Sequence, residues 1–253
     1  MKKINIILCL IIFSLGMNAC KKDNANSSYS YNVKMTDAPG PYDAVYIDLK
    51  SVEVITSNGS TVQLNANAGI YNLLSLSNGV DALIASGNLN ANTVNQVRLI
   101  LGANNSVVAN HVSYPLSVSS ADEAGLKLNV NHTIQSGTAY TALIDFDANA
   151  SIVETGSGSY KLKPVIRTIE ATNNASIKGQ ISLAGTLAYV TVTSASNVTY
   201  SSNVSSTGDF LVMGLSAGVY SVTVIPLFPL SPVSKNNVTV TANSTTNIGV
   251  VSL

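Results

Sequence analysis

The sequence is poor in reactive and charged side chains. Its 253 residues include no tryptophan, two cysteines and two histidines, and 10% are charged, with 13 Lys and Arg against 13 Asp and Glu. A net charge of +0 provides no basic face for a phosphate backbone, so we expect no nucleic-acid partner. Two cysteines cannot build a disulfide framework or a four-cysteine zinc site. The lack of tryptophan also argues against a sugar-cleaving enzyme, because such enzymes normally line their sugar subsites with that side chain.

The N-terminus has the features of an export signal. Two lysines near the start precede an apolar run over 4–15, and Ala19 stands before Cys20. The run is shorter than the roughly 20 apolar residues that span a bilayer, so it predicts a secretory signal peptide over 1–19. Cys20 after Ala19 resembles a bacterial lipobox, in which the cysteine becomes the lipidated first residue of the mature protein. An ordinary secretory signal is the alternative.

A polar tether is predicted behind the lipid, over 20–28. This segment has no hydrophobic periodicity, which is typical of a flexible linker. With Lys21 after the cysteine, it resembles the tethers of outer-membrane and surface lipoproteins of the Bacteroidetes. We therefore expect a monomer in the cell envelope, at the outer membrane or cell surface, held to the membrane through its lipid anchor.

The next segment, 29–170, is predicted to be a β-sandwich domain. Apolar residues alternate with polar ones along 45–54, which indicates a half-buried strand, and Asn58-Gly59 is a strong hairpin signal. Val80, Leu83 and Ile84 instead have helical spacing, so one short helix is predicted over 79–86. Further alternating runs predict strands at 31–35, 94–101, 125–130, 139–146 and 160–169.

A second β-sandwich is predicted over 175–253, after a linker at 171–174. The composition changes here, because the charged residues after 170 are limited to Lys178, Asp209 and Lys235. About seven short alternating strands separated by regular turns are typical of a small antiparallel sandwich. The fold class is therefore all-β, with two antiparallel β-sandwich domains of immunoglobulin-like or prealbumin-like type in series.

Both segments resemble known families. The first is similar to the domain of unknown function 4382, which implies a β-sandwich on an exported lipoprotein and no known activity. The residues that carry this likeness are Thr36–Pro39, Asp48–Val54, Tyr71–Leu76, Arg98–Leu101, Gly125–Leu128, Asp145–Ala148 and Leu162–Arg167. The second resembles the carboxypeptidase regulatory-like module, a transthyretin-like or starch-binding-like sandwich that acts as a stalk or accessory binder. The residues that carry it are Lys178–Ile181, Ala188–Val192, Gly208–Phe210 and Gly214–Val224.

The candidate site is a set of aspartates in the first domain. Asp145 and Asp147 are two residues apart on a predicted strand, so their carboxyl groups emerge on one face. Asp37, Asp43 or Asp48 could complete an oxygen-rich calcium site. Three interpretations stay open: a structural ion-pair network, a calcium site and an active site. The candidate ion-pair partners are Arg98, Lys127, Lys163 and Arg167.

The remaining signals favour a protein without catalysis. His111 and His132 stand alone among polar neighbours and are expected to be solvated loop residues, and no other metal or nucleophile motif is present in the sequence. We therefore expect no enzyme activity and no cofactor, apart from calcium in one interpretation. The prediction is a non-catalytic cell-envelope lipoprotein that binds a glycan or protein partner or acts in adhesion. The alternatives are a hydrolase using Asp145 and Asp147, and a purely structural envelope component.

Overall fold

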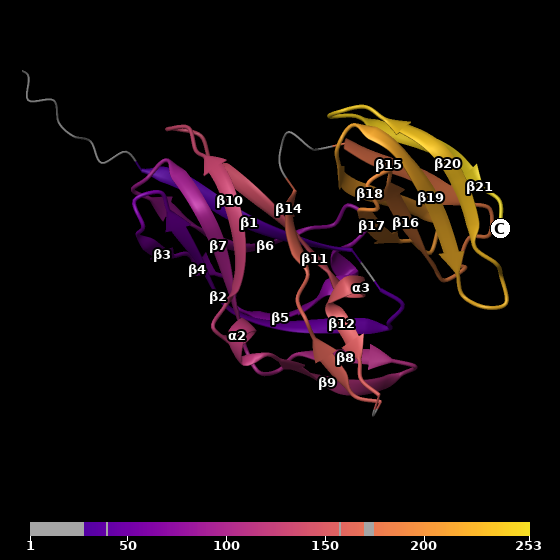
Figure 1. Ribbon diagram of the computed structural model, residues 1–253, viewed down its shortest axis with the longest axis horizontal. Helices are drawn as coiled ribbons and strands as arrows, with labels where there is room; N and C mark the ends of the chain where they lie inside the picture. Colours follow the sequence, from indigo (N-terminus) through magenta and orange to yellow (C-terminus); the bar gives the residue numbers. More distant parts are fainter. Residues whose placement is uncertain (1–27, 39, 157, 170–174) are drawn as a thin grey trace, which may run out of the picture.

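The computed structural model describes residues 28–38, 40–156, 158–169 and 175–253, and its strands form two β-sandwiches (Figure 1). The all-β fold class is confirmed. The signal peptide 1–19, Cys20 and the linker 171–174 lie outside the described residues. No helix in the described part of the chain is both long and apolar enough to cross a membrane.

The first sandwich contains two sheets and three single-turn helices. Its strands are β1 (Tyr29–Ala38), β2 (Ala44–Thr56), β3 (Thr61–Gln63), β4 (Asn65–Ala66), β5 (Gly69–Asn72), β6 (Ala82–Leu89), β7 (Thr93–Leu101), β8 (Ser106–Ala109), β9 (Val112–Val118), β10 (Leu126–Thr133), β11 (Tyr140–Asp147), β12 (Ile152–Glu154), β13 (Tyr160–Leu162) and β14 (Ile166–Ile169). The helices are the 3-10 turn η1 (Leu73–Leu76), α2 (Ser120–Glu123) and α3 (Ala148–Ser151).

The two sheets enclose one hydrophobic core. One sheet has the order β14-β11-β1-β6-β4, and the other has the order β10-β7-β2-β8-β9-β13-β12, with β3 and β5 also paired to β2. Alternate side chains of a strand point to opposite faces of the sheet, so one face of each strand can pack into the core. In β10 every second residue is buried in this way. Tyr31, Phe146 and Leu99 are among the buried side chains. Burial of each such side chain contributes about 1.5–3 kcal/mol to stability.

The hairpin signal at Asn58-Gly59 is confirmed, whereas the helix expected over 79–86 is wrong. Gly59 has φ +80° in the turn between β2 and β3. Most of 79–86 belongs instead to strand β6, which pairs with β1 and β4. A β-bulge shifts the register by one residue at this point, so Ile84 and Ala85 are both buried. The spacing of Val80, Leu83 and Ile84 marks no buried helix face, because Val80 and Leu83 are exposed and Ile84 alone of the three is buried.

The run 160–169, expected as one strand, is divided between the two sheets. β13 ends at Leu162 in one sheet, and β14 begins at Ile166 in the other. Pro164 lies between them and has no N–H to donate to a ladder. The crossing carries Arg167 onto the sheet that contains β1 and β11.

The second sandwich has seven strands within 175–253. They are β15 (Ala175–Ile181), β16 (Ala188–Ser194), β17 (Thr199–Asn203), β18 (Asp209–Leu215), β19 (Gly218–Pro226), β20 (Val233–Val240) and β21 (Thr245–Val251). One sheet has the order β18-β15-β21 and the other β17-β16-β19-β20. Their facing sides enclose a separate core that includes Phe210, Val190 and Val224. Each sandwich therefore has a hydrophobic core of its own.

Candidate functional site

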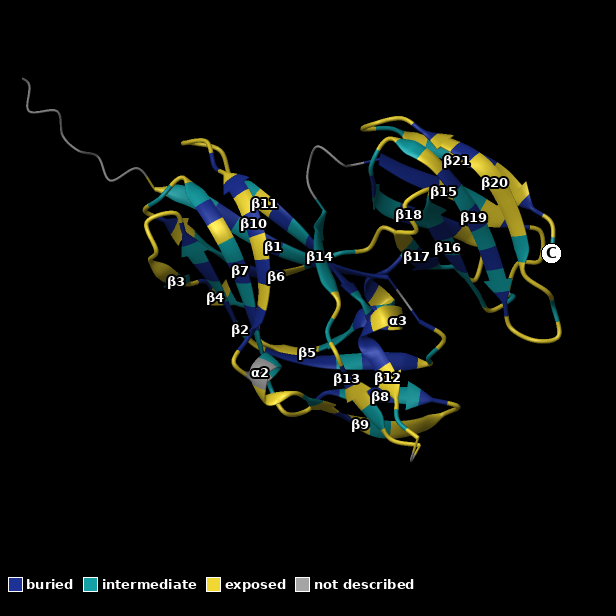
Figure 2. Cartoon of the chain, viewed as in Figure 1, coloured by how far each residue is buried: buried dark blue, intermediate teal, exposed yellow. Residues whose placement is uncertain are grey.

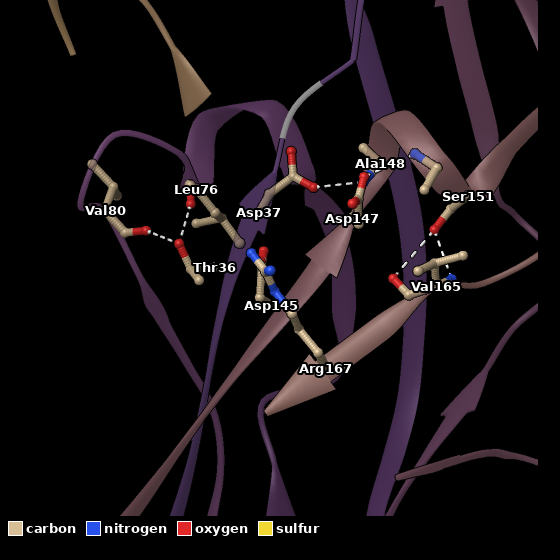
Figure 3. Close-up of polar contacts among 11 residues, drawn as sticks. Thr36, Asp37, Leu76, Val80, Asp145, Asp147, Ala148, Ser151, Val165 and Arg167 are labelled. Atoms are coloured by element: carbon tan, nitrogen blue, oxygen red, sulfur yellow. Dashed lines mark hydrogen bonds and ion pairs between the residues drawn. The ribbon is translucent and has the colours of Figure 1, made fainter. Parts of the chain in front are cut away.

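Strand pairing brings four of the predicted site residues together in the first sandwich. β1 runs parallel to β11 with Thr36 opposite Asp145, so the end of β1 places Asp37 beside the Asp145–Asp147 segment. β14 runs antiparallel to β11 with Arg167 opposite Asp145. Figure 3 shows these side chains gathered where the three strands meet. Each position is thus fixed by a backbone ladder and not by a mobile loop.

Asp145 and Arg167 form a buried ion pair. Arg167 Nε donates to Asp145 Oδ2 at 2.7 Å, and Arg167 Nη2 donates to the same oxygen. Asp145 is 3% exposed, and its Oδ1 has no hydrogen-bond partner among the described residues. Burial raises the pKa of Asp145 above its ordinary value, and the guanidinium of Arg167 opposes that rise. This contact supports the ion-pair interpretation for this aspartate.

Asp37 and Asp147 are engaged with the start of α3. Asp37 Oδ1 accepts the Ala148 N–H at 3.0 Å, and Asp147 Oδ1 accepts the Ala150 N–H at 2.8 Å as an N-terminal cap. Asp37 Oδ2 is buried and has no hydrogen-bond partner in the described part of the chain. Burial raises the pKa of Asp37 well above its ordinary value, and the negative charges of Asp145 and Asp147 add to that rise. Burial likewise raises the pKa of Asp147.

A small cavity lies between these residues and the second sandwich. Its volume is about 20 Å³, and its lining includes Asp37, Asp145 and Arg167 from the first sandwich and Ser201 and Ser202 from the second. A cavity of this size holds about one water molecule. The candidate site is therefore part of the junction between the two sandwiches.

The junction is held by polar and aromatic contacts. The Arg167 guanidinium lies 4.0 Å from the ring centroid of Tyr200 on β17, which is a cation–π contact across the two sandwiches. The Asn78 N–H donates to Ser202 Oγ at 3.1 Å, and Asn203 Nδ2 donates to Ser77 Oγ at 3.5 Å. Arg167 thus connects the buried carboxylate of one sandwich to an aromatic ring of the other.

A threonine on β1 positions the turn that meets the second sandwich. Thr36 Oγ1 lies 2.6 Å from the carbonyl oxygen of Leu76 and 2.9 Å from that of Val80, so it can donate to either (Figure 3). Gly79 lies within this turn at φ +88°, and a Cβ there would lie 2.9 Å from Leu211 Cδ2. Glycine therefore permits both the turn and the close approach of the second sandwich.

The other candidate residues lie away from this site. Asp48 Oδ2 accepts hydrogen bonds from the backbone N–H and the side-chain Nδ2 of Asn104 at 3.2 and 3.1 Å, which holds the loop after β7. Arg98 pairs with Glu53 at 3.3 Å, and Lys127 lies opposite Arg98 in the ladder of β10 and β7.

Lys163 is exposed, next to the end of β13. Asp43, the remaining acid considered for calcium, accepts the His111 N–H at 2.7 Å. Among the described residues, Arg167 is the one of the four predicted basic partners that contacts a candidate aspartate, Asp145.

The described residues contain no group of three or more His, Cys, Asp or Glu side chains that could hold a metal ion. Asp48 is separated from Asp37, Asp145 and Asp147 by its different strand pairing. Calcium binding stays a prediction that this arrangement does not favour.

The expectation that His132 is a solvated loop residue is wrong. It is 3% exposed, its Nδ1 is hydrogen-bonded to Tyr31 Oη at 2.6 Å, and its ring lies 4.8 Å from that of Tyr140. The signal was present in the sequence, because position 132 continues the buried series of Leu126, Leu128 and Val130. His132 therefore belongs to the core of the first sandwich.

A family model described as Domain of unknown function (DUF4382) matches residues 30–164, which is more than half of the chain. The chain belongs to this family. The match to DUF4382 includes Asp37, Asp145 and Asp147 but ends before Arg167 and the second sandwich. The partner of Asp145 thus comes from outside the matched DUF4382 segment. Comparison with the curated proteins gives no match.

Solved structures with similar chains include a Bacillus anthracis protein and two pilin subunits. The TIE protein of Bacillus anthracis is 11% identical with a TM-score of 0.28, and the match covers 98% of this chain and 43% of that one. The major pilin subunit BcpA of Bacillus cereus is 9% identical with a TM-score of 0.24, and the match covers 89% and 99% of the two chains. The shaft pilin spaA of Lactobacillus rhamnosus GG, as its D295N mutant, is 9% identical with a TM-score of 0.18, covering 87% and 96%. These scores are too low to carry an argument about function.

Proposed function

We propose that this chain is a non-catalytic, lipid-anchored protein of the cell envelope that presents its second sandwich to a glycan or protein partner, as in adhesion. The observation that carries the proposal is the use of the candidate carboxylate Asp145 in the junction. It binds Arg167, and Arg167 packs on Tyr200 of the second sandwich. A charge used in this way fixes one domain on the other and does not face a substrate.

The hydrolase alternative is weaker on geometric grounds. A glycosidase needs two acids about 5 to 9.5 Å apart on either side of a bond that it cleaves. Here the cavity beside Asp145 has a volume of about 20 Å³, and Asp147 caps α3. A sugar ring is much larger than the single water that fits such a space.

The N-terminal sequence supports one part of the proposal, that the chain is exported and anchored to the membrane by a lipid. Full-length chain produced in a lipoprotein-acylating bacterium is expected to incorporate labelled palmitate and to sediment with the membrane fraction. The Cys20→Ala variant is expected to lose the label. Label that persists in this variant, or wild-type chain without label, would contradict the lipid anchor.

A second experiment distinguishes binding of a partner from hydrolysis of a polysaccharide. Cells that display the chain are incubated with insoluble polysaccharides and with envelope preparations, and both retention of the cells and release of reducing sugar are measured. Retention without release is the expected result. Release of sugar that disappears in Asp147→Asn would replace this proposal with the hydrolase, and neither retention nor release would favour a purely structural component.

A further inference from the structure

The outward face of the sheet β17-β16-β19-β20 is regular and uncharged over its central strands. Val190 and Val192 of β16 and Val222 and Val224 of β19 point into the core. The alternate side chains therefore point outward. In β16 these are Tyr189, Thr191 and Thr193, and in β19 they are Ser221, Thr223 and Ile225, all partly exposed (Figure 2).

Cross-strand register arranges the hydroxyl groups in two rows. Thr193 lies opposite Ser221, and Thr191 lies opposite Thr223. Hydrogen bonds extend the rows to the flanking strands, since Thr223 Oγ1 lies 2.8 Å from Ser234 Oγ and Thr193 Oγ1 lies 3.1 Å from Thr199 Oγ1. The hydroxyl groups of Thr193 and Thr223 are thus ordered by their neighbours before any ligand arrives, which reduces the entropy that binding would cost.

Two apolar rows continue the same face toward the loop after β19. Tyr189 lies opposite Ile225, and the Leu227 N–H donates to the Leu187 carbonyl at 3.0 Å, which adds one more rung to the ladder. Leu187 is 71% exposed and Leu227 is 52% exposed. Phe228, in the adjoining loop, is 96% exposed. This uncharged apolar surface is open to solvent in the described part of the chain.

Charge is absent from these four rows, whose members on β16 and β19 are uncharged residue types. Lys235 of the neighbouring strand β20 is turned to the other sheet, where its Nζ donates to the Ile248 carbonyl at 2.8 Å. An ionic partner would therefore find no complementary charge on the rows. The face suits a neutral ligand with both hydroxyl groups and apolar ring surfaces.

We propose that this face binds an extended, uncharged polysaccharide. The apolar side of a pyranose ring would lie on Tyr189 and the exposed leucines, while ring hydroxyls would exchange hydrogen bonds with Thr191 and Thr223. The inference rests on the proposed function and names the class of partner. It places the binding site on the second sandwich, on a face whose β17 edge adjoins the junction, since Ser201 lies opposite Thr191 and lines the cavity beside the aspartates.

The size of the face supports a glycan over a second protein. Four rows about 6.7 Å apart on strands about 4.8 Å apart give a surface of less than roughly 300 Å², because Ser201 on the β17 edge is buried at the junction with the first sandwich. A stable protein interface buries about 800 Å² on each partner. A bilayer is also a poor fit, because insertion would take two rows of hydroxyl groups out of water.

Isothermal titration of the Cys20→Ser chain, with both sandwiches present, tests the proposal. The probes are hexasaccharides of cellulose, xylan, mannan, amylose and chitin, with heparin and phosphatidylcholine vesicles for comparison. We expect at least one neutral hexasaccharide to bind and heparin and vesicles not to bind. Thr191→Val and Tyr189→Ala are each expected to weaken that binding about tenfold.

The control variant is Val250→Ala, because Val250 is 64% exposed on β21 of the opposite sheet. It is expected to bind as the parent chain does, and circular dichroism checks that all variants are folded. Binding that Thr191→Val and Tyr189→Ala leave unchanged would overturn this face as the site while keeping a glycan-binding protein. Binding to heparin or vesicles without any neutral hexasaccharide, or no binding to any probe, would overturn the polysaccharide proposal. In that case, retention of displaying cells on envelope preparations would preserve the broader proposed function.

Discussion

Asp37 carries a carboxyl group that folding removes from water without full compensation. One oxygen accepts a backbone N–H, and the other has no hydrogen-bond partner among the described residues. Because burial raises the pKa of Asp37, the folded state holds a proton that the unfolded chain has released wherever the pH lies between the two pKa values. The free energy of unfolding must therefore decrease as the pH rises from about 4, the unfolded-state pKa, through the raised folded-state pKa.

The Asp37→Asn substitution is expected to remove this dependence. The amide keeps an oxygen for the Ala148 N–H and cannot ionise. The variant should be more stable than the parent chain at pH 8, by about 1.4 kcal/mol for each pKa unit of the shift, and the difference should vanish toward pH 4. Urea unfolding at a series of pH values measures it. A variant less stable than the parent at pH 8 would show that the ionised carboxylate is stabilising.

Arg167 is expected to be required because its removal leaves the Asp145 carboxylate buried without a partner. Arg167→Ala should lower the free energy of unfolding by about 3 kcal/mol. Combining Asp145→Asn with Arg167→Met should cost less than Arg167→Ala alone, because no charge then remains buried.

The matched control for Arg167→Ala is Lys161→Ala, an exposed lysine for which a change within about 0.5 kcal/mol is expected. Chemical denaturation provides all these values. A double variant as unstable as Arg167→Ala would mean that loss of the guanidinium's own contacts, and not the unpaired charge of Asp145, causes the destabilisation.

At the scale of elements, periodicity predicted the long regular strands and failed where a strand is irregular. β2, β7 and β11 were found because one face of each is buried. The helix expected over 79–86 was wrong because its spacing included the exposed Val80 and Leu83, and Pro164 divided a run that was expected as one strand. The aspartate–arginine contact depends on antiparallel pairing of β11 with β14. Asp37 joins it through parallel pairing of β1 with β11, two strands far apart in sequence. Sequence spacing could identify Asp145 and Arg167 as candidate site residues. It could not show which of the four candidate basic residues pairs with Asp145.

The close packing of β15 gives a prediction for the second sandwich. A Cβ at Gly179 would lie 2.5 Å from Phe210 Cζ and 3.0 Å from the backbone oxygen of Gly249, and Phe210 is itself buried. Gly179→Ala should therefore destabilise this sandwich by about 1–3 kcal/mol. Gly156→Ala is the control, because a Cβ there meets nothing within 4 Å. Thermal unfolding of the two variants compares them, and equal midpoints would mean that the strands separate at little cost.

At the scale of the whole molecule, the two sandwiches are coupled through a small junction. Polar contacts, one cation–π pair and the approach of Leu211 to Gly79 hold it together. The second sandwich contributes Tyr200 and Ser202 from β17, an edge strand whose remaining sheet carries the proposed binding face. Its orientation is therefore set by the same residues that enclose the buried carboxylates.

A bulky side chain at position 79 is expected to displace one sandwich from the other. Gly79→Leu would place its side chain against Leu211, and small-angle X-ray scattering should record a larger radius of gyration. Gly59→Leu is the matched control, because Gly59 has a similar positive φ of +80° and open space around it. Both variants carry the same backbone strain, so scattering that changes equally in both would contradict a specific role of the junction.

The position of β1 gives the first sandwich a mechanical property. β1 is the central strand of its sheet, paired in parallel with β11 from Tyr31 to Ala38 on one side and with β6 on the other. The chain from the N-terminal segment enters the fold at Tyr29, the first residue of this strand. A pull along the strand would load its ladder bonds in shear, all together, instead of opening them one at a time as in unzipping. The end of the fold nearest the proposed anchor therefore has a strand geometry that resists traction.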